Sequence, residues 1–88
     1  MAIAQVGSIV LFALDRGVVR PAIILEFPGG PKNNANLQVF VCRSDSGLSA
    51  GACGAVDPSS SMQGLWYANH APQSDPGVFP AGTWKTPD

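Results

Sequence analysis

Residues 6–27 hold most of the aliphatic bulk of the chain and constrain its fold more than any other stretch. Two apolar runs, residues 7–14 and 18–27, flank Asp15, Arg16 and Gly17, whose residue types favour a tight turn. The second run is rich in β-branched side chains, which favour a strand over a helix. The stretch therefore predicts a β-hairpin on which the rest of the fold is built.

Both faces of the first predicted strand are apolar. Side chains alternate along a strand, so Ile9 and Leu11 share one face, and Val10, Phe12 and Leu14 share the other. A chain of this length has little interior in which to hide both faces. We therefore expect one of these two sets to meet another chain.

Three shorter strands follow the hairpin, at residues 36–43, 65–69 and 83–85. In the first of them, Leu37, Val39 and Val41 are expected to face the core. Pro21, inside the second strand of the hairpin, cannot donate a ladder hydrogen bond, which predicts an edge position or a bulge.

The remaining segments show no regular pattern. Residues 44–63 are rich in Ser, Gly and Ala and predict a long loop without a helix, either an interaction surface or a tolerated insertion. Residues 71–88 form a segment rich in Pro and Gly. The sequence predicts one all-β domain over residues 1–88, a small antiparallel barrel of the SH3-like or OB-like kind with about five short strands.

The composition favours an assembled protein. Charged residues make up 12% of the 88 residues, about half of the usual share, whereas hydrophobic residues make up 45%. So few charges cannot cover the surface of a small domain. Part of the surface is therefore expected to be uncharged and polar, and part to be buried against copies of the chain or a partner.

The charge balance argues against nucleic acid as a partner. The net charge is −1, and the five Lys and Arg residues are scattered singly, whereas phosphate binding needs a positive patch. The apolar start of the chain is too short to span a bilayer and lacks a preceding basic region. We expect synthesis in the cytoplasm and no membrane partner.

No catalytic set is evident. His70 is the single histidine, and its spacing from Cys42 and Cys53 supports neither a nucleophile and base pair nor a metal site. The sequence therefore predicts no enzyme activity and no cofactor. The two cysteines allow a disulfide, or two reduced thiols with one of them buried in the third strand.

Large aromatic residues gather in the last third of the chain, at Trp66, Tyr67, Phe79 and Trp84. They either close the open end of a small barrel or form a recognition pocket or an oligomer contact, because Trp and Tyr dominate such contacts. Arg20 is expected to reach into that pocket. Together with Phe12, these residues are the candidate interface or pocket.

Four short motifs follow one another along the chain: Gly7-Ser8-Ile9-Val10, Arg20-Pro21-Ala22-Ile23-Ile24, Asn36-Leu37-Gln38-Val39-Phe40, and Gly82-Thr83-Trp84 followed by Pro87-Asp88. In these motifs and their order, the chain resembles short proteins encoded by tailed bacteriophages. The chain is longer than that pattern between Cys42 and Gly64. It also has Lys85 and Thr86 where that pattern has His and an aromatic residue.

The resemblance implies a phage origin. With the composition, it leads us to expect a virion structural protein, a capsid decoration or cement component made in the host cytoplasm and located in the particle. Its expected partners are capsid proteins and copies of itself. The alternative is a small phage-encoded binding protein that sequesters a ligand or blocks a host defence protein.

Overall fold

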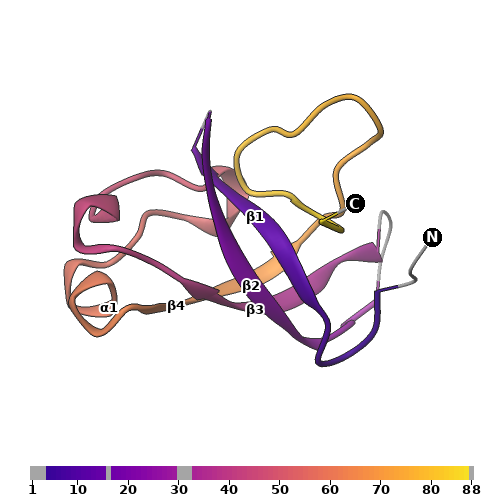
Figure 1. Ribbon diagram of the computed structural model, residues 1–88, viewed down its shortest axis with the longest axis horizontal. Coiled ribbons are helices and arrows are strands. Elements are labelled where there is room, and N and C mark those ends of the chain that lie inside the picture. The colour runs from indigo at the N-terminus through magenta and orange to yellow at the C-terminus, as the bar shows by residue number, and fades with distance from the viewer. Residues whose placement is uncertain (1–3, 16, 30–32, 88) are drawn as a thin grey trace.

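Among the residues that the computed structural model describes, five strands form one antiparallel sheet, with short helical segments between the third and fourth strands of the chain (Figure 1). These residues are 4–15, 17–29 and 33–87. The strands are β1 (Ile9–Asp15), β2 (Val18–Glu26), β3 (Ala35–Phe40), β4 (Leu65–Ala71) and β5 (Trp84–Lys85), in the order β4-β3-β2-β1-β5. The prediction of an all-β fold with five short antiparallel strands is confirmed.

The sheet is not closed into a barrel by strand pairing. β4 and β5 are its two edges, and among the described residues one parallel bridge, between Gln73 and Trp84, joins the segment after β4 to β5. In this bridge the Trp84 N–H donates to Pro72 O over 3.0 Å, and the Ser74 N–H donates to Trp84 O over 2.8 Å. The predicted barrel is thus an open sheet, because β5 is only two residues long.

The hairpin predicted from residues 6–27 is formed by β1 and β2. Leu11 is paired with Pro21, whereas the pairing of β2 with β3 begins one residue later, at Ala22. Pro21 therefore lies where β2 has no paired neighbour on its β3 side, which agrees with the predicted edge position. Arg16 of the predicted turn, residues 30–32 of the following loop, and Asp88 lie outside the described residues.

The inner face of the sheet carries the core. Leu37, Val39 and Val41 are buried, as predicted, and Phe12 packs against Trp66 with ring centroids 6.0 Å apart. Full burial of an aliphatic or aromatic side chain contributes about 1.5–3 kcal/mol, so these residues supply much of the driving force for folding.

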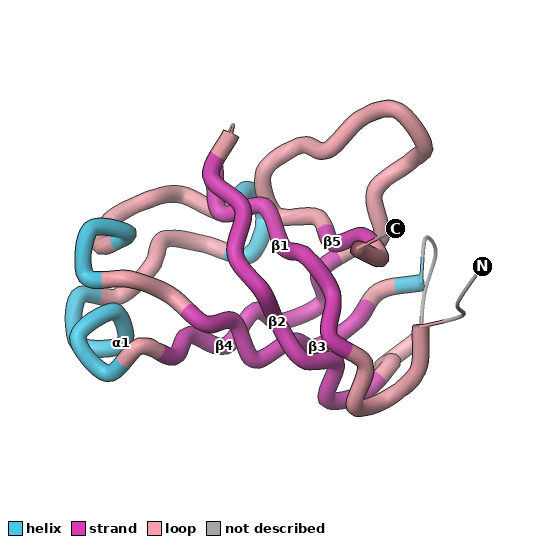
Figure 2. The backbone as a smooth tube through the Cα atoms, viewed as in Figure 1, coloured by secondary structure: helices cyan, strands magenta, loops and turns pink. Residues whose placement is uncertain are grey.

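Residues 44–63 contain helical segments that the sequence did not lead us to expect. They are the 3-10 helices η2 (Arg43–Asp45) and η3 (Gly51–Cys53) and the α-helix α1 (Pro58–Gln63). Figure 2 shows η2 and α1 together at one end of the sheet. The prediction of a helix-free loop was wrong.

The ends of α1 are determined by local chemistry. The Asp57 carboxylate accepts a hydrogen bond from the Ser59 N–H at 2.8 Å, and Pro58 occupies the first turn, where a missing N–H is tolerated. Gly64 ends the helix in the left-handed conformation, with φ of 81°. With only six residues, the helix shows too little periodicity to be recognised in the sequence.

The segment that contains η3 packs closely against the chain before β5. A Cβ atom added to Gly51 would lie 2.6 Å from Ala81 O, and one added to Gly82 would overlap with Ala50 O. Both glycines have positive φ, 58° and 85°. Glycine is therefore needed at both positions, since any side chain would separate these two segments.

Candidate interaction surface

The strand register places outward-facing side chains of β1 to β4 in two adjacent rows. Across the sheet, the first row consists of Ile9, Ile23, Gln38 and Tyr67, each paired directly with the next. The second row lies two residues away from the first on each strand, so its side chains point to the same side of the sheet. It consists of Leu11, Pro21, Phe40 and Leu65. We call these eight residues the outer face.

The outer face is apolar and accessible. None of its eight residues is charged, and five of them are exposed. Gln38 carries the one amide of the face. Lys85 of β5, which is paired with Leu11, carries a charge at the edge of this face. An exposed apolar surface of several strands is typical of an interaction site.

This arrangement decides between the two sets of residues expected in the first strand. Val10, Phe12 and Leu14 are fully buried in the core, which excludes the first of the two alternatives. Ile9 and Leu11 point outward, with Ile9 exposed and Leu11 half-buried. Only this second set is available to a partner.

Three of the predicted interface residues are instead part of the core. Phe12, Trp66 and Trp84 are buried, and the Trp84 indole N–H donates to Asn33 O at 3.3 Å. Their large apolar surfaces gain most from leaving water, which explains why they fill the interior. They therefore form no open recognition pocket.

Arg20 does not reach into an aromatic pocket either. It pairs with Asp45, with Arg20 Nε 2.8 Å from Asp45 Oδ2 and Nη2 2.9 Å from Oδ1. Asp45 is only 2% exposed and also accepts the Cys42 N–H at 2.8 Å. This ion pair attaches η2 to β2, so Arg20 has a structural contact that the sequence did not reveal.

The ion pair shifts both ionisation equilibria. The hydrogen bond from Arg20 holds the pKa of Asp45 below its ordinary value, and the Cys42 N–H acts in the same direction against the effect of burial. The same bond raises the pKa of Arg20. Both groups therefore stay charged at neutral pH.

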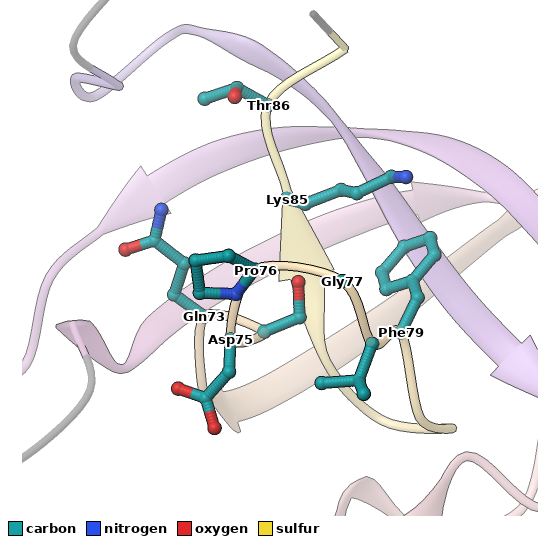
Figure 3. Close-up of a pocket in the computed structure, with 9 residues that line it drawn as sticks. Gln73, Asp75, Pro76, Gly77, Phe79, Lys85 and Thr86 are labelled. Carbon is teal, nitrogen blue, oxygen red and sulfur yellow. The ribbon is translucent and has the colours of Figure 1, made fainter.

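The other two predicted interface residues are accessible and lie in different places. Tyr67 belongs to the outer face, whereas Phe79 lines an open groove of about 620 Å³ between the segment after β4 and the end of the chain (Figure 3). Lys85 Nζ lies 4.8 Å from the centre of the Phe79 ring. Its ammonium group and the Asp75 carboxylate lie on opposite sides of the groove (Figure 3).

The two cysteines are free thiols, so no disulfide joins Cys42 to Cys53 in the structure. Cys42 follows β3 and is exposed, contrary to the expected buried thiol in that strand. Cys53 is half-buried, with Sγ 3.7 Å from both Asn69 O and Gly82 O. Burial raises the pKa of the Cys53 thiol.

His70 lies at an irregular position of the backbone near the end of β4. It is exposed with a left-handed φ of 56°, and its backbone N–H donates to Asn36 Oδ1 at 2.9 Å. Among the described residues, no group of three or more His, Cys, Asp or Glu side chains could hold a metal ion. Within the same residues, no helix has the length and apolarity needed to cross a bilayer.

The sequence matches no protein-family model, and searches of curated proteins and of solved structures give no match.

Proposed function

We propose that this chain is an accessory structural protein of a bacteriophage particle, a capsid decoration or cement component. In this role it binds capsid protein and copies of itself, and it performs no catalysis. The observation that carries the proposal is the outer face, a continuous uncharged surface over four strands. The resemblance to short proteins of tailed phages supports the phage origin.

The low solubility of an exposed apolar face favours this role. A small domain with few charges that leaves such a face in water is prone to associate. In a particle, the same face is covered by protein, and its burial stabilises the assembly. We place the protein in the virion after synthesis in the host cytoplasm. Its net charge of −1 supports protein rather than nucleic acid as the partner.

The proposal is tested by quantitative mass spectrometry of purified particles. We expect the protein in many copies per particle, and its absence from particles would contradict the proposal. A variant with Ile9→Lys and Tyr67→Lys should be lost from particles, because it places two charges on the outer face. The control is Met62→Lys, since Met62 is 67% exposed on α1 and is not one of the eight residues of the outer face.

The groove favours a second candidate function, a binding protein that sequesters a ligand or blocks a host defence protein. Phe79 and Lys85 combine an aromatic ring with a cation at its opening, which suits an anionic ligand with an apolar part. This candidate predicts that nucleotides raise the melting temperature and that Phe79→Ala with Lys85→Ala removes the increase. An unchanged melting temperature across a nucleotide panel, with no binding to host lysate proteins, would reject it.

A further inference from the structure

We infer that the outer face binds the outer face of a second copy, forming a two-fold symmetric dimer with Gln38 close to the symmetry axis. The inference rests on the proposed function, because it names the self-contact that this function requires. The charge, the exposed area and the polar groups of the outer face support it.

The charge distribution selects an uncharged partner surface. Burying a charged partner group against these eight residues would leave that group without a counter-ion. A second outer face avoids this penalty, because it brings the same two rows of apolar side chains. Two sheets of this kind pack face to face at about 10 Å with their strands nearly aligned.

The exposed area reaches what a specific dimer needs. Ile9, Tyr67, Leu65 and Phe40 expose 61%, 49%, 43% and 40% of their surfaces. Since large side chains have full areas of about 150–250 Å², these four residues expose about 300–480 Å² per copy. The exposed Pro21 and the other three, half-buried residues bring the outer face to about 500 Å². Two copies then bury about 1,000 Å² in total, which is the minimum for a biological interface.

The amide of Gln38 distinguishes self-association from a contact with an apolar foreign surface. Gln38 is in an inner position of the first row, half-buried between Ile23 and Tyr67. An apolar partner would cover the amide and leave its donors and acceptor without partners, which is unfavourable. Around a two-fold axis, each Gln38 amide can donate to and accept from its copy.

The test introduces a charge of either sign at the symmetry axis. Analytical ultracentrifugation then measures the oligomeric state at protein concentrations that span about two decades around the micromolar range. The wild-type protein should form a dimer. Gln38→Glu and Gln38→Lys should each be monomeric, because like charges then face one another, raising Kd by about 100-fold. An equimolar mixture of the two variants should regain the dimer as a heterodimer.

The matched control is Gln63→Glu, which makes the same chemical change on the exposed last residue of α1. It should leave the dimer intact, and circular dichroism should show that all variants are folded. A monomeric wild-type protein, or a mixture that stays monomeric while both variants are folded, overturns the inference. A wild-type monomer that is still found in particles overturns the dimer alone, whereas a dimer absent from particles overturns only the proposed function.

Discussion

Asp45 connects two segments that are distant in the sequence, because its carboxylate binds Arg20 of β2 and the backbone of Cys42 after β3. We predict that Asp45→Asn lowers the free energy of unfolding by about 2 kcal/mol, since charged hydrogen bonds to a buried group are lost. Urea denaturation at neutral pH measures this change. The control Arg43→Gln, an exposed residue of the same 3-10 helix, should alter stability by less than about 0.5 kcal/mol.

The same residue predicts a pH dependence. The folded-state pKa of Asp45 lies below the unfolded value of about 3.9, so its ionised carboxylate contributes stability above that pH. The contribution is lost as the pH falls through the lower, folded-state pKa. The difference in unfolding free energy between the wild type and Asp45→Asn should therefore shrink below about pH 4. A difference that stays constant into strong acid would contradict the role of the ion pair.

The two thiols should react at different rates with a thiol reagent. Cys42 is exposed, whereas burial both shields Cys53 and raises its pKa, which reduces its reactive thiolate. Intact mass after a short reaction of the native protein should show one label, and unfolding should add the second. Cys42→Ser should remove the fast label, and a native protein that takes up no label would show that both thiols are blocked.

At the level of the elements, the contact between η3 and the chain before β5 depends on two glycines. We predict that Gly82→Ala lowers the free energy of unfolding by about 3 kcal/mol. Two effects contribute: the new methyl group overlaps with Ala50 O, and alanine is strained at a positive φ. Gly77→Ala is the matched control. Its φ of 83° is similar, but no atom lies within 4 Å of the added Cβ.

The difference between these two alanine variants in thermal or urea unfolding isolates the overlap from the backbone strain. Equal losses of stability would show that the two segments are not tightly packed. Gly51→Ala should resemble Gly82→Ala, because it meets the same contact from the other side.

The strands could be predicted and the helices could not, for physical reasons. Alternation and β-branched residues located the first three strands, since these patterns persist over several residues. The helix at residues 58–63 lacks an apolar stripe and depends on Asp57 and Gly64 at its ends. The 3-10 helix η2 depends on the contact of Asp45 with Arg20, 25 residues earlier, which no local pattern contains.

The candidate site could be predicted only in part. Alternation limited the outward residues of the first strand to two sets, and the structure selected Ile9 and Leu11. Residue type alone suggested that Trp66 and Trp84 form an interface, but large aromatic residues gain as much from the core as from a partner. The direction of each side chain depends on register, which a single sequence does not contain.

At the level of the whole molecule, the two tryptophans lie on the opposite edge strands and report on the sheet together. We predict one cooperative unfolding transition. The variant Trp66→Phe leaves Trp84 as the fluorescent probe, and Trp84→Phe leaves Trp66. In each variant, the unfolding midpoint from fluorescence should equal the midpoint from far-ultraviolet circular dichroism. Separate midpoints for the two probes would indicate two independently unfolding parts.

The pairing of β1 with β5 joins Leu11 to Lys85. During translation, β1 therefore lacks one of its two neighbours until residue 85 has been synthesised and released from the ribosome. The core around Trp84 cannot close before that moment, since long-range pairing has to wait for its partner. The domain of a nascent chain thus folds to completion only after residue 85 has left the ribosome, and until then the apolar hairpin is exposed to chaperones and to other nascent chains.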